Sequence, residues 1–241
     1  MTAGEARAAL VTGATAGLGR AIALRLGSDG LFVHAVGRDP ERGAKVVAEI
    51  KQSGGQARFQ AADLANVSTI GPLARETGPV DVLVNNAGFS VWGATEEMRA
   101  EQFDAMFAAN VRAPYFLVAA FAPTMAEKGV GVIIYIGSMA GIVGLPTGAA
   151  YGATKAALAA LTRGWTAEYS PRGVRINTVA PGPVYTRPEA RALFDDLGAT
   201  TALHRAAQPG EIADLVGFLA SPQATYITGA TLAADGGRTA I

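Results

Sequence analysis

Val11-Thr12-Gly13-Ala14-Thr15-Ala16-Gly17-Leu18-Gly19 is the stretch of sequence that decides the fold. It follows a short apolar run, residues 8–11, and leads into a segment of helical periodicity, residues 19–28. Its glycines allow a tight turn and a close approach of the backbone to a ligand. The free N–H groups at the start of the following helix would suit a pyrophosphate. Taken alone, the stretch fits two interpretations about equally well: a pyrophosphate-binding turn, and a turn that needs glycines only for its shape.

Apolar runs and helical segments keep alternating along the rest of the chain. We expect strands at residues 8–11, 31–36, 57–61, 80–84, 132–136, 175–179 and 231–234. We expect helices at residues 19–28, 40–52, 67–76, 98–128, 151–169 and 211–219. Several of the runs are apolar nearly throughout, which is typical of strands buried on both faces. The pattern predicts one doubly wound α/β domain over residues 1–241, with a seven-stranded parallel sheet and helices on both faces.

Two segments interrupt this regular alternation. Residues 98–128 contain Pro114, so we expect two consecutive helices or one kinked helix there. Residues 183–207 carry Pro183 and Pro188 beside a weakly amphipathic piece at residues 189–197. A long excursion beside a sheet edge often covers a site, so residues 183–207 are expected to form a substrate lid within the domain.

The composition argues against several classes of function. The chain of 241 residues has 20 Lys plus Arg against 20 Asp plus Glu, and a net charge of zero gives no general attraction to nucleic acid or to an anionic membrane. Without cysteine there is no disulfide, no thiolate catalysis and no Cys-ligated metal, and two unpaired histidines give no metal-site pattern. No signal peptide and no run of 18 apolar residues is found, so we expect no membrane span and a cytoplasmic location.

Further motifs give the chain a specific resemblance. The glycine-rich stretch has the spacing G-x-x-x-G-x-G, and Asn85-Asn86-Ala87-Gly88 follows the fourth expected strand. Ser138 ends the fifth strand, Tyr151 and Lys155 form Y-x-x-x-K, and Pro181-Gly182 follows the sixth strand. In this order the motifs resemble the short-chain dehydrogenase/reductase family, from about Arg7 to about Thr239. The resemblance implies a Rossmann-type fold and an oxidoreductase that moves a hydride between a nicotinamide cofactor and a carbonyl or alcohol carbon.

Tyr151 and Lys155 are the residues expected to carry the chemistry. At positions i and i+4 they share one helix face, which by itself is usually surface decoration. A free tyrosine has a pKa of about 10, and a cation one helical turn away favours the phenolate and lowers that pKa. The resemblance implies that Tyr151 is the general acid or base, and that Lys155 tunes it and holds the ribose hydroxyls.

The resemblance adds Ser138 and Asn110 to the catalytic set. Ser138 would hold the substrate oxygen by a hydrogen bond. Asn110 would hold a water that relays protons to the lysine, and as a mediocre helix former it is also expected to distort its helix. A serine that merely ends a strand and a simple helix break are the plainer alternatives.

The end of the second strand predicts which cofactor is used. An acidic residue there would bind the adenosine 2′-OH and favour NAD. The chain has Gly37 there, followed by Arg38, whose guanidinium suits a phosphate, so NADP is expected and NAD is the alternative. One feature weakens this expectation, because Ala16 stands where many NADP users of the family carry a second basic residue. Asp39 also lies close by, but one turn too late to read the ribose.

The resemblance also implies the remaining contacts. Asp63 is expected on the adenine, although a helix N-cap near Asn66 competes for nearby polar residues. Asn86 is expected along the cofactor path, and Asn85 is expected to brace the strands. The full set of implied cofactor-binding residues is Gly13, Thr15, Gly17, Leu18, Gly19, Gly37, Arg38, Asp63, Leu64, Asn86, Ala87, Gly88, Tyr151, Lys155, Pro181, Gly182, Val184 and Thr186.

Apolar side chains in the loops beyond the strand ends are expected to form a substrate pocket, with core packing as the alternative. They are Phe89, Trp92, Met139, Val143, Leu145, Tyr185 and Phe194. The predicted function is NADP-dependent reduction of a ketone, an aldehyde or a β-oxoacyl group to an alcohol, or the reverse, on a small-molecule substrate. The alternatives are an NAD-linked alcohol dehydrogenase with the same site and, with less support, a non-catalytic nucleotide-binding protein.

A resemblance-based expectation concerns assembly. Family members commonly pair through the two long helices that follow the fourth and fifth strands. Here residues 151–169 are rich in alanine, and small side chains allow helices to approach closely. We therefore expect a homotetramer of two-fold symmetry.

Overall fold

A computed structural model describes residues 7–241, and these form a single seven-stranded sheet. The strands are β1 (Ala8–Thr12), β2 (Phe32–Gly37), β3 (Gln56–Ala61), β4 (Val82–Asn85), β5 (Gly131–Ile136), β6 (Val174–Pro181) and β7 (Thr231–Ala234). They lie in the order β3-β2-β1-β4-β5-β6-β7, and each neighbouring pair is parallel. The order grows in opposite directions from β1 and from β4, which is the doubly wound arrangement. The predicted fold class is confirmed, with strand ends displaced by one or two residues.

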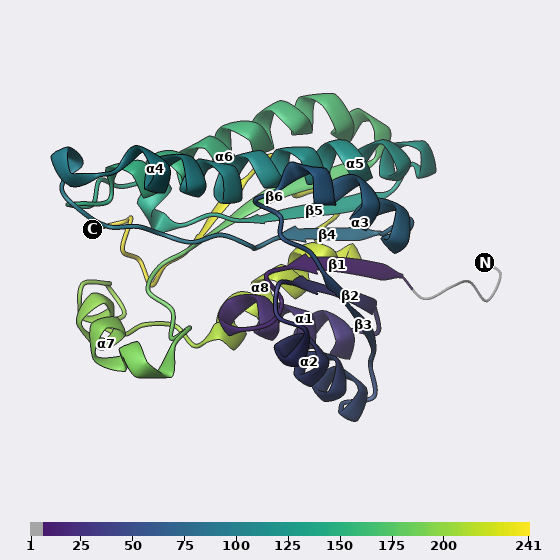
Figure 1. The fold of residues 1–241 in the computed structure, drawn as a ribbon, viewed down its shortest axis with the longest axis horizontal. Coiled ribbons are helices and arrows are strands. Elements are labelled where there is room, and N and C mark those ends of the chain that lie inside the picture. Colours follow the sequence, from purple (N-terminus) through teal and green to yellow (C-terminus); the bar gives the residue numbers. More distant parts are fainter. Residues whose placement is uncertain (1–6) are drawn as a thin grey trace.

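Helices cover both faces of the sheet (Figure 1). One layer contains α1 (Gly17–Ser28), α2 (Pro40–Gln52) and α8 (Pro209–Ala220); the other contains α3 (Ile70–Thr77), α4 (Ala100–Phe107), α5 (Ala113–Lys128) and α6 (Ala149–Tyr169). Alternate residues of each strand serve the two layers: Val84 belongs to the core under α1 and α8, and Leu83 to the core under α5 and α6. Burial on both faces explains why the strand segments are apolar nearly throughout.

The segment expected at residues 98–128 is interrupted, as the sequence predicts. Between α4 and α5 lies a π-helical segment, Ala108–Arg112, and Pro114 follows it in the first turn of α5, where its missing N–H removes one backbone donor from this otherwise continuous helical stretch. Pro123 lies inside α5 and was not foreseen as a feature of that helix. Within residues 7–241, Ala100–Lys128 is the one helical stretch that by its length and mean hydropathy (1.3) alone could cross a membrane. Of its most apolar 18-residue window, 44% is buried inside the protein, and core helices pass the same test.

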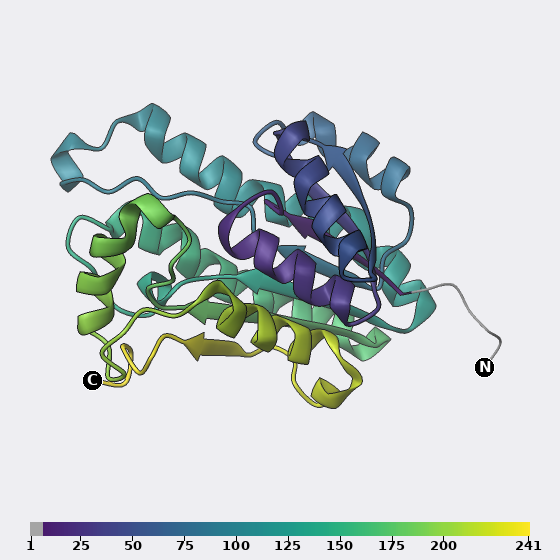
Figure 2. The same cartoon turned by 90° about the horizontal axis from the view of Figure 1, so that it is seen from below.

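The carboxyl ends of all seven strands meet at one edge of the sheet, and residues 183–207 lie beyond that edge. They contain one short 3₁₀ turn, Pro188–Ala190, and α7 (Arg191–Ala199), which starts two residues later than the amphipathic piece expected from the sequence. Two backbone hydrogen bonds join the two ends of this excursion. Tyr185 N donates to Ala207 O (3.0 Å), and Ala207 N donates to Pro183 O (2.9 Å). Figure 2 shows α7 beside the chain's C-terminus, away from the layer of α1, α2 and α8. The lid role of this excursion stays a prediction.

Candidate active site

The glycine-rich turn after β1 forms a narrow cradle at the point where the strand order reverses. Gly13 and Gly17 have φ values of +64° and +50°, which favour glycine. A Cβ on Gly19 would lie 2.2 Å from the Gly13 carbonyl oxygen, so no larger residue fits there. Ala16, the N-cap of α1, provides no side-chain hydrogen bond, so the first N–H groups of α1 have no cap of this kind. The cradle therefore has both the space and the donors that a pyrophosphate needs.

The loop after β4 is tied to this cradle by hydrogen bonds. Asn86 Nδ2 donates to Thr12 O (2.8 Å), and the Thr12 hydroxyl accepts from the backbone N–H groups of Asn86 and Ala87 (3.0 Å each). Asn86 thus supports the cradle, consistent with its expected place along the cofactor path. Asn85 is the last residue of β4 rather than part of the loop, so the motif begins inside the strand.

The expectation that Asn85 braces the strands finds no support from its side chain. Asn85 is buried, and within residues 7–241 neither atom of its amide has a hydrogen-bond partner. Its neighbour across the sheet is Tyr135, whose hydroxyl is also buried and without a partner there. These unpaired polar atoms lie on the face of the sheet covered by α5 and α6, and no sequence pattern pointed to them.

The end of β2 places Gly37 against the glycine-rich turn. A Cβ on Gly37 would lie 2.6 Å from Thr15 Cγ2, so the two loops touch closely at this position. Arg38 follows as an exposed residue. Asp39 is the N-cap of α2 and accepts a hydrogen bond from Arg42 N (3.1 Å), so its carboxylate is used by the helix. This agrees with the expectation that Asp39 does not read the ribose.

The loops after β3 and β6 complete the same edge. Asp63 is exposed and accepts from Ala65 N (3.2 Å), while Leu64 is buried and Asn66 caps the turn that follows, as the competing interpretation predicted. Pro181 is the last residue of β6, and a Cβ on Gly182 would lie 2.7 Å from the Asp235 Cα atom. Val184 is buried, and Thr186 approaches Gly17, with its Cβ 3.3 Å from where a Cβ of Gly17 would be. The implied cofactor-binding residues are therefore brought to one edge of the sheet.

Ser138, Tyr151 and Lys155 meet where α6 crosses the end of β5. Ser138 stands two residues beyond β5, rather than ending it, and its oxygen accepts from Ala140 N (3.1 Å) as the cap of a 3₁₀ turn. Tyr151 lies in the first turn of α6. Lys155 is buried one turn later, with Nζ 5.7 Å from the centre of the Tyr151 ring and donating to Ile136 O (2.8 Å). The predicted helix face carries both residues, and it points into the protein rather than to the surface.

The pKa shifts in this cluster correct one expectation. Burial raises the pKa of Tyr151, and the Ser138 hydroxyl acts in the opposite direction with a smaller effect. Burial also lowers the pKa of Lys155 to about 8. The expected lowering of the Tyr151 pKa by Lys155 is thus wrong for the protein by itself, because burial disfavours the phenolate more than its neighbours favour it. A tyrosine that keeps its proton is suited to donate it.

Asn110 holds three parts of the site together. It lies in the π-helical segment, which confirms the expected helix distortion. Its Oδ1 accepts from Phe89 N (3.0 Å), and its Nδ2 donates to Phe89 O (2.9 Å) and to the Thr154 hydroxyl (3.1 Å). Both hydrogens of the Asn110 amide are therefore used, so its side chain could hold the expected water only through the second acceptor position of Oδ1.

The aromatic side chains expected in the substrate pocket fall into two groups. Trp92 packs on Tyr151, with ring centres 5.6 Å apart, and Gly148 makes room for it, since a Cβ there would lie 2.6 Å from Trp92 Cζ3. Tyr185 and Phe194 pair edge-on in the excursion at 6.1 Å. Of the other candidates, Phe89 is exposed, Val143 and Leu145 are half-buried, and Met139 is buried, which fits the core-packing alternative for that residue.

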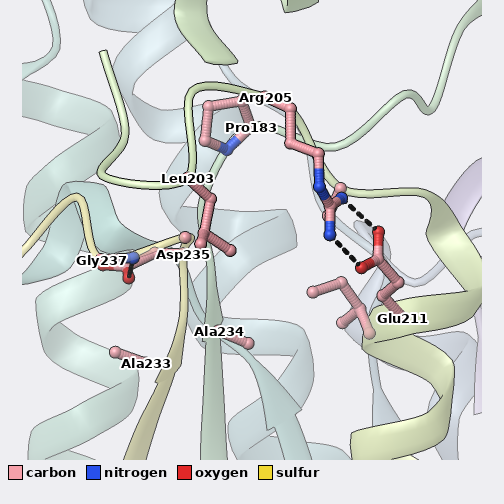
Figure 3. A pocket seen from close by; sticks show the side chains of 11 residues that line it. Pro183, Leu203, Arg205, Glu211, Ala233, Ala234, Asp235 and Gly237 are labelled. Carbon is pink, nitrogen blue, oxygen red and sulfur yellow. Dashed lines mark hydrogen bonds and ion pairs between the residues drawn. The ribbon is translucent and has the colours of Figure 1, made fainter. Parts of the chain in front are cut away.

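A cavity of about 250 Å³ lies elsewhere, under the returning end of the excursion and beside β7 and α8 (Figure 3). Arg205 and Glu211 form a two-pronged ion pair at its side, with distances of 2.7 and 2.8 Å. The cavity contains none of Ser138, Tyr151 and Lys155, so we do not equate it with the reaction site. Among residues 7–241, no three His, Asp or Glu side chains gather as a metal ion would require.

Comparison with known proteins gives consistent matches over most or nearly all of the chain. A family model described as short chain dehydrogenase matches residues 7–194. Cyclopentanol dehydrogenase of Comamonas sp. is 34% identical, with 96% of each chain covered. A solved structure described as a short chain dehydrogenase/reductase family protein has a TM-score of 0.93 and 44% identity, covering 98% of this chain and 99% of the other. A blue fluorescent protein from a metagenomic library, solved with NADPH, has a TM-score of 0.90 and 35% identity, covering 96% and 97%.

Proposed function

Because the chain belongs to the short-chain dehydrogenase/reductase family of oxidoreductases, we propose that it is an NADP-dependent enzyme that reduces a ketone, an aldehyde or a β-oxoacyl group to an alcohol, or catalyses the reverse. The observation that carries the proposal is the meeting of Ser138, Tyr151 and Lys155 beside the glycine-rich cradle. The similarity to a cyclopentanol dehydrogenase and to an NADPH-bound structure supports the substrate class and the cofactor.

The residues at the sheet edge fit a nicotinamide dinucleotide. Gly13, Gly17 and Gly19 leave the backbone open where a side chain would block a ligand, and the uncapped start of α1 offers N–H donors to a pyrophosphate. Arg38 would meet the adenosine 2′-phosphate, Asp63 the adenine, and Lys155 the second ribose. When bound, the nicotinamide supplies or accepts the hydride.

The remaining chemistry is carried by side chains of this chain. Tyr151 keeps its proton near neutral pH and would donate it from Oη to the oxygen that becomes the alcohol. Ser138 accepts a hydrogen bond from Ala140 N, so its own O–H can point to the same substrate oxygen and stabilise charge on it. Trp92 beside Tyr151 would exclude water from one side of the reacting carbon.

The test compares the turnover of wild type and of Tyr151→Phe with NADPH, and turnover is measured through the absorbance of the reduced nicotinamide. The substrate panel contains an acyl thioester, aliphatic and aromatic ketones, sugars and steroids. Removing only the hydroxyl should leave NADPH binding intact and reduce turnover at least about a hundredfold. Near-wild-type turnover by Tyr151→Phe contradicts the assigned role, and a wild type that binds NADPH but reduces nothing in the panel favours the non-catalytic alternative.

A further inference from the structure

The end of β2 is enclosed by two loops, which fixes where residues 38–42 lie. Ala14 N, from the glycine-rich turn, donates to Val36 O (3.0 Å), and Ala62 N, after β3, donates to Gly37 O (2.9 Å). Arg38 is the first residue to leave the sheet between them. It is exposed, and within residues 7–241 its guanidinium has no ion-pair or hydrogen-bond partner.

Arg42, one turn into α2, is directed back toward this point. Side chains of a helix lean toward its N-terminus. Arg42 follows this rule, since its Nε lies 3.2 Å from Asp39 Oδ2 and its backbone N–H donates to Asp39 Oδ1. The Arg42 side chain is 65% exposed, and the described residues provide no further acceptor for its terminal nitrogens. The fork of donors on Arg42 is thus held beside residue 39 with its outer N–H groups facing solvent.

Other cations of this region are committed to partners further along the helices. Arg20 pairs with Glu49, and Lys45 Nζ lies 2.8 Å from Glu41 Oε1. Both oxygens of Asp39 face Arg42, so the charge of this carboxylate is largely balanced and part of its acceptor capacity is already used. The charge at the end of β2 is therefore two guanidiniums and one neutralised carboxylate, which favours a dianion over a neutral hydroxyl.

We propose that Arg42 is the second cation, after Arg38, that binds the 2′-phosphate of NADP, and that Asp39 is a positioning residue that holds Arg42 in place. The inference rests on the proposed NADP dependence of the enzyme. It assigns to the first turn of α2 the charge that Ala16 does not supply from the glycine-rich turn. Without Arg42, the carboxylate of Asp39 would face the phosphate directly, so the loss of Arg42 combines a missing contact with a new repulsion.

The experiment measures dissociation constants for NADPH, NADH and 2′,5′-ADP with wild type, Arg42→Ala, Lys45→Ala and Asp39→Asn/Arg42→Ala. Arg42→Ala should weaken NADPH and 2′,5′-ADP on the order of tenfold, the effect of one charge-assisted hydrogen bond, and leave NADH nearly unchanged. Lys45→Ala removes the same charge about one turn further along α2. It should leave the dissociation constants for NADPH, NADH and 2′,5′-ADP nearly unchanged. Asp39→Asn keeps the cap of α2 but removes the carboxylate charge, so the double variant should regain part of the lost NADPH affinity.

The outcomes separate this inference from the proposed function. If wild type binds NADH as tightly as NADPH, the NADP preference itself is wrong. If wild type prefers NADPH but Arg42→Ala behaves like Lys45→Ala, or weakens NADPH and NADH equally, the preference stands and Arg42 does not read the phosphate. If the double variant regains none of the lost NADPH affinity, the proposed role of Asp39 is wrong. Circular dichroism and thermal unfolding of each variant establish that α2 is still folded.

Discussion

Gly37 stands where an acidic residue would favour NAD, and the structure adds a steric constraint at the same position. A Cβ there would lie 2.6 Å from Thr15 Cγ2 in the glycine-rich turn. We predict that Gly37→Asp weakens NADPH binding without improving NADH binding, because the new side chain displaces Thr15 before it can reach a ribose. Gly37→Asp combined with Thr15→Ser removes the obstructing methyl group and should improve NADH binding. Titration of both cofactors checks this, and Gly37→Ala separates the steric effect from the charge.

Lys155 predicts a pH dependence of cofactor binding. Its pKa is lowered to about 8 by burial, so the ammonium form is present below that pH and is lost as pH rises through it. If the ammonium holds the ribose next to the nicotinamide, NADPH affinity is highest below about pH 8 and falls above it. The fragment 2′,5′-ADP lacks that ribose and should show no such decline. Parallel declines for NADPH and 2′,5′-ADP would place the titrating group elsewhere.

The sequence predicted which residues lie together at the candidate site better than it predicted their protonation. The positions of Ser138, Tyr151 and Lys155 follow from the order of strands and one helix face, which local patterns encode. The pKa of Tyr151 depends on how deeply the folded protein buries it, and that is a property of tertiary packing. For the same reason no pattern revealed the unpaired amide of Asn85 beside the Tyr135 hydroxyl.

The π-helical segment between α4 and α5 predicts a localised effect on stability. Asn110→Asp keeps the acceptor for Phe89 N but loses both donors and places a carboxylate beside the Phe89 carbonyl oxygen. We expect the free energy of unfolding to fall by about 3 kcal/mol, since a buried charged group is left poorly paired. Thr154→Val removes one partner of Asn110 and should cost about 1 kcal/mol. Urea unfolding measures both, and equal losses would show that the clamp on Phe89 contributes little.

At the level of elements, the sequence predicted element types better than element boundaries. It was least accurate where the backbone departs from the regular repeat of a helix or a strand. Helix and strand types were right, while β2 ends at Gly37 rather than residue 36 and α6 begins at Ala149 rather than residue 151. Boundaries of this kind depend on capping and on neighbouring strands as well as on hydrophobic period. Pro114 and Asn110 signalled an interruption of residues 98–128, but the sequence could not say that it takes the form of a π-helical turn, or which partners Asn110 finds in the folded protein.

For the whole molecule, His34 predicts a loss of stability in mild acid. It is buried on β2, and Arg58 Nε donates to its Nδ1 (3.0 Å) while Arg58 Nη2 binds the carbonyl oxygens of Glu76 and Thr77. Burial, aided by the charge of Arg58, lowers the pKa of His34, so the folded state keeps it neutral. Below the unfolded-state pKa of about 6.5 only the unfolded chain takes up the proton, and stability falls with pH until the folded pKa is reached.

The check is the free energy of unfolding between pH 8 and a pH on the order of 5, below the unfolded-state pKa, for wild type, His34→Gln and His204→Gln. His34→Gln can still accept from Arg58 but does not titrate, so its stability should depend less on pH than that of wild type. His204→Gln, in the exposed excursion, serves as the control and should follow wild type. Identical pH dependence of wild type and His34→Gln would mean that other groups cause the acid sensitivity.

The outer surface of the layer formed by α4, α5 and α6 has features of an interface between copies of this chain. Phe103, Tyr115 and Phe116 are 41, 46 and 43% exposed, which is unusual for large aromatic side chains, and α6 presents the small exposed residues Ala153, Ala156, Ala160 and Gly164 along one stripe. We predict a homotetramer of two-fold symmetry in which this face is one interface. Phe116→Asp combined with Ala160→Arg should reduce the assembly by light scattering at micromolar concentration, because charges and bulk at close-packed helices oppose docking. Tyr226→Asp, at a fully exposed residue outside this face, is the matched control, and a wild type that scatters as a monomer contradicts the prediction.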